Sequence, residues 1–160
     1  MDVVGSLLDR VCELLRESPA LDAVEILPAY PGGYRPQPLR KPALLVGIRE
    51  LALLPGALGD YLGSGGKGES FGKRIEATLL LDLLLPPLAG AMEMIPLAEA
   101  ICQRLVLDED GILEDIRWEE AKEDRRAGGL FMRMSGSFRA LVTRTEQAGE
   151  IREITIIWKG

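Results

Sequence analysis

The chain has 160 residues, 47% of them hydrophobic and 28% charged, with a formal net charge of −6 at pH 7 and a pI of about 4.8. These values are typical of a globular protein and argue against wholesale disorder; the length predicts one domain with a single core. The acidic balance argues against nonspecific binding to nucleic acid or to an anionic membrane, because both require a basic footprint.

Histidine is absent, and with it the usual general base, the commonest metal ligand and the physiological pH switch. We therefore expect no bound metal and no cofactor. The two cysteines, Cys12 and Cys102, fall on the apolar sides of expected helices. That placement favours buried, reduced thiols over a disulfide, which would fit an exported protein better.

The N-terminal residues lack the basic start of a signal peptide. The leucine-rich segment 79–97 contains acidic residues and prolines, which argue against a bilayer-spanning helix. We expect a protein made and folded inside the cell.

The first part of the chain predicts a helix, a short strand and an irregular segment. Apolar residues recur at helical spacing over residues 3–17, and a strand is expected at 23–27. Residues 28–42 then hold five of the ten prolines together with Tyr30 and Tyr34. This proline-rich arm is interpreted either as a long connector or as an arm for recognition or subunit contact.

A second strand is expected at 43–51, and a glycine-rich loop at 59–72 is interpreted as a flexible hairpin tip. Gly63, Gly65 and Gly68 match G-x-G-x-x-G. A dinucleotide site needs that motif between a strand and a helix, whereas here the loop leads into a strand. We therefore expect no nucleotide site.

The central unit is a strand at 74–85 followed by a helix at about 93–105. Period-two spacing puts one apolar set on a single face of this strand, namely Ile75, Ala77, Leu79, Leu81, Leu83 and Leu85. Pro86-Pro87 ends the strand, because proline cannot donate to a ladder.

An acidic tract follows, with nine carboxylates between Asp108 and Asp124. One interpretation is a divalent-metal or paired-carboxylate active site. The other is a solvated strand edge and loop, which is favoured because calcium-loop spacing is absent and basic residues such as Arg117 and Lys122 are interleaved.

Two final strands at 129–144 and 151–158 are expected to pair as an antiparallel hairpin, with Gly136 permitting a bulge or a close backbone approach. Arg133 and Arg139 share one face of the first strand, either to bind an acidic partner or as ordinary outward charges. Before these two strands, Ile112, Ile116 and Trp118 keep the even-numbered spacing of a further strand. The expected order is therefore α-β-β-β-α-β-β-β. This is an α+β fold with two helices packed on one face of a mixed, mainly antiparallel sheet.

In order and spacing, residues 40–158 resemble the tail terminator (tail completion) proteins of long-tailed bacteriophages and contractile prophage particles. The resemblance is carried by turns and apolar positions, namely Val46-Gly47-Ile48, Pro55 to Gly63, Phe71 to Arg74, Leu85-Pro86, Ala89-Gly90-Ala91 and the closing hairpin. The proline-rich arm at 28–42 has no counterpart in the resemblance.

The resemblance implies a structural, non-enzymatic subunit that forms a ring, commonly a hexamer, on the last ring of the tail tube. The ring would stop tube polymerisation, receive the head connector, meet the sheath in a contractile particle and let DNA pass without reading its sequence. Assembly would occur in the bacterial host cytoplasm, ending in a virion or tail-like particle. Eight residues are our candidates for subunit or partner contacts: Tyr30, Tyr34, Asp60, Tyr61, Lys67, Phe71, Arg133 and Arg139.

Three alternatives remain open on the sequence. The first is another virion part, such as a head–tail joining or baseplate subunit. The second is a small hydrolase or metal-dependent enzyme that uses the carboxylates of residues 108–124. The third is a cytosolic peptide-binding module that uses the proline-rich arm.

Overall fold

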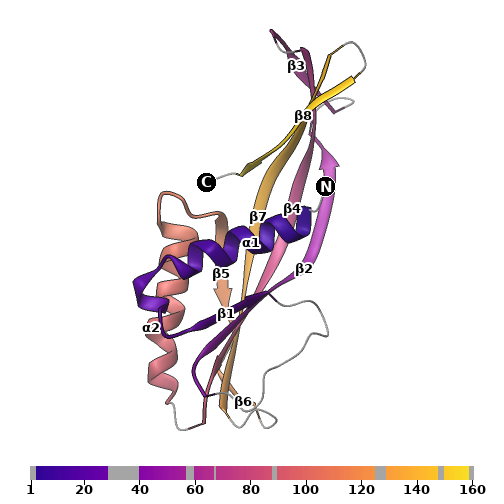
Figure 1. The fold of residues 1–160 in the computed structure, drawn as a ribbon. Helices are drawn as coiled ribbons and strands as arrows, with labels where there is room; N and C mark the ends of the chain where they lie inside the picture. The colour runs from indigo at the N-terminus through magenta and orange to yellow at the C-terminus, as the bar shows by residue number, and fades with distance from the viewer. Residues whose placement is uncertain are drawn as a thin grey trace.

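The sheet is organised around two long strands, β4 (Gly68–Leu85) and β7 (Gly129–Gln147), which pair antiparallel over almost their whole length. The computed structural model describes residues 3–28, 40–56, 60–66, 68–87, 90–124, 129–147 and 150–158. Around the two long strands lie β1 (Glu25–Pro28), β2 (Ala43–Pro55), β3 (Tyr61–Gly65), β5 (Leu113–Trp118), β6 (Lys122–Asp124) and β8 (Glu150–Trp158). Within the described residues the sheet is eight-stranded, with the central order β1-β2-β4-β7-β5 (Figure 1).

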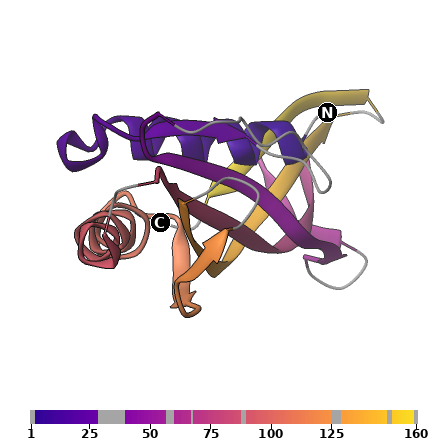
Figure 2. The ribbon, with the colours of Figure 1, turned by 90° about the horizontal axis from the view of Figure 1, so that it is seen from below.

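Two helices pack on this sheet. α1 (Val3–Arg16) crosses the strands and packs on β1 and β2, whereas α2 (Ala91–Cys102) runs alongside the strands and contacts β4 (Figure 1). A 3₁₀ turn, η1 (Pro19–Leu21), follows α1, and a π-helical turn, η3 (Gln103–Leu107), continues α2. Seen from below, α2 is viewed nearly end-on beside α1 (Figure 2).

Both helices cover the same face of the sheet. The odd-numbered residues of β4 from Ile75 to Leu85 are buried, as the period-two pattern predicts, and they share one core with α1 and α2. The helices contribute fully buried side chains to this core, among them Leu7, Leu14, Met94 and Ile101. We call this side the helix-covered face and the other side the open face.

The predicted fold class, α+β, is confirmed. Among the described strands, β1 and β2 pair parallel and every other pair is antiparallel, so the sheet is mixed and mainly antiparallel. The expected closing hairpin is present as β7 and β8.

The predicted element order is incomplete in two places. Residues 61–65 form β3, which pairs with residues 68–71 at the start of β4, so the expected hairpin is present but most of the described segment is strand rather than loop. The short strand β6 also pairs with the start of β7 inside the charged tract. Both segments have low intrinsic strand propensity, and pairing with a long neighbouring strand overrides it.

The cysteines are both free, as expected. Cys12 is buried in the core, whereas Cys102 is only half-buried and its Sγ accepts a hydrogen bond from Trp118 Nε1 at 2.9 Å. Burial raises the pKa of both thiols above the ordinary value, so both stay protonated at neutral pH.

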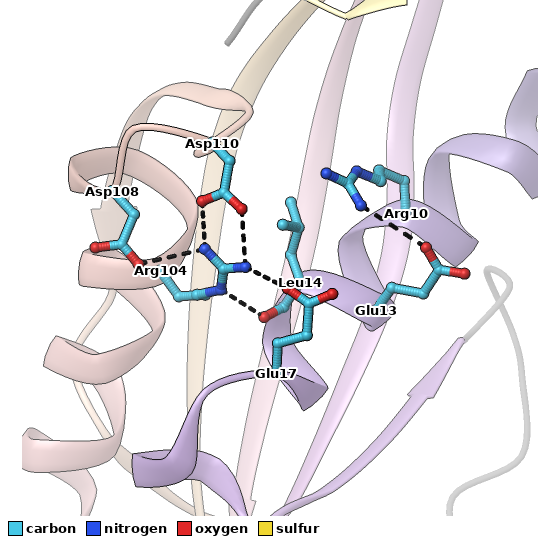
Figure 3. A network of polar contacts seen from close by, with 7 residues as sticks. All are labelled: Arg10, Glu13, Leu14, Glu17, Arg104, Asp108 and Asp110. Atoms are coloured by element: carbon cyan, nitrogen blue, oxygen red, sulfur yellow. Dashed lines mark hydrogen bonds and ion pairs between the residues drawn. The ribbon is translucent and has the colours of Figure 1, made fainter.

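Arg104 ties the end of α1 to the turn that follows α2 (Figure 3). Its guanidinium donates to the Leu14 carbonyl at 2.7 Å and to Glu17 at 2.6 Å. It also binds Asp108 at 3.3 Å and both carboxylate oxygens of Asp110. The side chain is only 13% exposed, so these contacts fix the relative positions of the two helices.

Candidate functional site

The sheet continues past the helices as a slender strand extension. We define this extension as β3, residues 68–74 of β4, residues 141–147 of β7, and β8. It exists because β4 and β7 are longer than their neighbours: β2 pairs with β4 only from Lys73 onward, and β3 and β8 flank the rest. Figure 1 shows β3 and β8 at the end remote from α2.

Three of the candidate contact residues come together at the base of this extension. The rings of Tyr61 and Phe71 meet edge to face with centroids 5.6 Å apart, and Asp60 forms an ion pair with Lys73 at 2.5 Å. The guanidinium of Arg144 lies 5.4 Å from the centre of the Phe71 ring. Aromatic and cation–π contacts of this kind make the β3–β4 hairpin a defined surface rather than a loose tip.

Two glycines allow the strands of the extension to approach closely. A Cβ at Gly72 would lie 2.6 Å from Leu62 Cδ1 and 3.0 Å from the Val142 carbonyl oxygen. A Cβ at Gly56 would lie 2.4 Å from the Gly72 carbonyl oxygen. A larger residue at position 56 would therefore push the end of β2 away from β4, and one at position 72 would crowd the Leu62 side chain and the backbone of β7.

Apolar side chains remain exposed on and beside the extension. Leu53 near the end of β2 is 58% exposed, Ile157 in β8 is 52% exposed, and Tyr61 and Leu62 are also exposed. These side chains lie on both margins of the sheet, and exposed apolar side chains of this kind are available for contact with another protein.

Arg133 and Arg139 lie on the open face, and both have acidic partners within the chain. Arg133 binds Asp82, its directly opposite residue in β4, through two hydrogen bonds of 2.8 and 3.0 Å. These bonds raise the pKa of Arg133 above its ordinary value. Arg139 lies 3.7 Å from Glu76 and 3.5 Å from Glu114.

The open face also contains a shallow depression of about 210 Å³ around Arg139. Glu50, Glu76 and Glu114 line it together with Ser137. Because Arg139 already contacts two of these carboxylates, an acidic partner would have to displace them. The sequence pattern located both arginines correctly but did not reveal Asp82, Glu76 and Glu114 as their partners, since cross-strand pairs depend on register.

The carboxylates of residues 108–124 are distributed among separate contacts. Asp108 and Asp110 bind Arg104, Glu114 lies beside Arg139, and Asp115 accepts hydrogen bonds from the Ser137 hydroxyl at 2.6 Å and from its backbone N–H at 2.9 Å. In the part of the chain that the structure describes, no three His, Cys, Asp or Glu side chains are grouped so as to hold a metal ion.

Tyr30, Tyr34 and Lys67 lie outside the described residues, as does most of the proline-rich arm. The exposed apolar residues Leu53, Leu62 and Ile157 were missed by sequence reasoning, because alternation alone does not show where the helices stop covering a strand.

No protein-family model matches the chain, and no curated protein matches it. Among the described helices, none combines the length and the apolar character needed to cross a membrane.

Proposed function

We propose that this chain is a structural subunit of a ring that caps the tail tube of a phage or phage-tail-like particle. In this role it would end tube polymerisation and provide the surface on which the head connector docks. The proposal rests on the resemblance in order and spacing over residues 40–158 and on one structural observation, the strand extension.

The strand extension supports an assembly role because of its shape and its exposed side chains. It projects past the helices, so neither α1 nor α2 covers it as they cover the centre of the sheet (Figure 1). Covering its exposed apolar groups with another protein surface would lower the free energy, because it removes them from water. A ring needs a contact of this kind on each subunit, with a different patch on the next subunit.

The open face is consistent with a structural surface. Its two arginines are already paired within the sheet, Arg133 with Asp82 and Arg139 with two glutamates, so they are not free to bind phosphate. Such a surface suits contact with protein, and equally a channel wall that does not hold DNA phosphates.

The test uses the purified chain and its cognate tail-tube protein. Tubes polymerised with the chain present should be short and should bear a ring at one end in electron micrographs. A variant with Leu62→Ser and Ile157→Ser should cap poorly, because it removes exposed apolar area from the extension.

The matched control is Met92→Ser with Leu107→Ser. These two apolar residues are more exposed than Ile157 but lie on α2 and η3, away from the extension. Equal loss of capping in both variants would show that the extension is not the contact surface. Binding to a head connector without any effect on tube length would favour a head–tail joining subunit instead.

A further inference from the structure

Several strands of the described sheet pair on one side only, and the two longest open stretches, in β2 and β8, lie on opposite margins. On one margin, β1 pairs with β2 only over Ala43–Val46, and no other described strand pairs with the outer edge of residues 47–55. On the other margin, β8 pairs with β7 on one side, and no described strand pairs with its outer edge. The two open stretches, 47–55 and 150–158, are equally long.

The two edge strands repeat the same local pattern. Each contains the tripeptide Ile-Arg-Glu, at residues 48–50 in β2 and at residues 151–153 in β8. In each, the register with the inner strand shifts at the arginine: residue 49 is skipped between Ile48 and Glu50, and residue 152 between Ile151 and Glu153. A β-bulge therefore falls at the same place in both edges.

Charges and bulges on an edge strand usually prevent pairing with another chain. Here, however, the charges on the β2 edge are complementary to those on the β8 edge. If β2 and β8 run antiparallel with residue 49 opposite residue 153, then residue 50 stands opposite residue 152. Both charged positions then meet the opposite charge, and residues 48 and 51 meet the apolar positions 154 and 151. Opposite charges directly across a ladder stabilise pairing, whereas like charges oppose it.

We propose that the outer edge of β2 in one copy of this chain pairs antiparallel with the outer edge of β8 in a second copy, in this register. Because the two edges differ, the contact is head-to-tail: the first copy keeps its β8 edge, and the second copy keeps its β2 edge, for a further neighbour. Main-chain hydrogen bonds provide the affinity and the charged pairs select the register. This inference deepens the proposed function by naming the contact between subunits. That repeated contacts close into a ring rests on the proposed function.

Charge reversal tests the register directly. Sedimentation velocity over a range of protein concentrations should show concentration-dependent self-association of the wild-type chain. Arg49→Glu and Glu153→Arg should each weaken it about tenfold, since each change turns an attractive cross-strand pair into a repulsive one. The double variant, with both changes, should recover wild-type association to within about twofold.

Arg40→Glu is the matched control, because Arg40 is also exposed and its reversal changes the net charge equally, but it lies before the start of β2. It should leave association unchanged. Edge pairing is overturned if the wild-type chain stays monomeric at every concentration, or if the double variant is as weak as the single ones. Tube capping by the wild-type chain is measured separately. Capping without edge pairing would support the proposed function alone, whereas recovery of association in the double variant without capping would support edge pairing alone.

Discussion

At the scale of single residues, Arg104 is the main polar link between separate parts of the chain. It contacts a carbonyl and a carboxylate at the end of α1 and two carboxylates of the turn after η3 (Figure 3). The neighbouring carboxylates raise its pKa above the ordinary value, and it lowers the pKa of Asp110 in return. Its role in this structure is to hold two helices together.

Replacing Arg104 by alanine should lower the free energy of unfolding by about 2 kcal/mol, because hydrogen bonds to charged groups are lost and the Leu14 carbonyl loses its donor. Urea unfolding measures this as a lower midpoint at unchanged slope. The control is Arg10→Ala, which removes a surface ion pair of 3.9 Å with Glu13 and should cost no more than about 0.5 kcal/mol. Equal effects of the two substitutions would contradict the role of Arg104.

Asp115 should make stability depend on pH. Hydrogen bonds from the Ser137 hydroxyl and N–H lower the pKa of Asp115 below its ordinary value of 3.8. A lowered pKa in the folded state stabilises the fold at pH values above 3.8, and this stabilisation is lost as the pH falls through the folded-state pKa.

The Asp115→Asn variant tests this dependence, because asparagine keeps an oxygen acceptor but loses the charge. Unfolding free energies measured from neutral pH into acid should show the wild type more stable at pH 7, with the difference disappearing as the carboxylate protonates. A difference that stays constant across the whole pH range would contradict the assignment.

At the scale of elements, the position of β5 depends on a close approach at Gly136. A Cβ there would lie 2.8 Å from the Asp115 carbonyl oxygen and 2.6 Å from Leu113 Cδ1. The sequence predicts either a bulge or a close approach at this glycine. The close approach is what the structure shows, while the bulge occurs in β5 between Leu113 and Asp115.

Gly136→Ala should therefore lower the free energy of unfolding by about 1–3 kcal/mol, since a backbone atom of β5 has to move. Thermal or urea unfolding measures the loss. The matched control is Gly65→Ala in β3, where an added Cβ would meet nothing within 4 Å, and the expected change is within about 0.5 kcal/mol. A neutral Gly136→Ala variant would show that β5 is not held at this distance.

The elements that were predicted from sequence are those in which the apolar period and the burial agree. The odd-numbered residues from 75 to 85 are all apolar and the helices cover the face on which they lie, so β4 was predicted there. Residues 61–72 contain glycines and polar residues with no clear period. Residues 69–72 form strand where β7 extends far enough to pair with them, and residues 61–65 form strand by pairing with that part of β4. Sequence reasoning cannot show this without the length of the partner strand.

The candidate contact residues also divide into those that the sequence reveals and those that depend on the partner strand. Tyr61 and Phe71 were predicted as contact candidates because they lie in the glycine-rich segment, and the structure brings their rings together. The partners of Arg133 and Arg139 come from other strands, and only the register of β4 and β5 against β7 identifies them.

At the scale of the whole molecule, the described residues combine a helix-covered centre with a strand extension and with open edges in β2 and β8. The centre contains the large core around β4, which gives each copy a stable fold. The extension presents exposed apolar groups, and the edges of β2 and β8 present strand margins with which no described strand pairs. These are the parts of the fold suited to contact with other subunits. In the proposed ring, the centre would keep each subunit folded, and the extension and edges would contact the neighbouring subunits.

The measurement that most directly tests the central claim is the length distribution of tail tubes polymerised with and without the purified chain. We expect short tubes with a ring at one end, in proportion to the amount of chain added. Tubes of unchanged length, with no ring and no chain sedimenting with them, would contradict the proposed function.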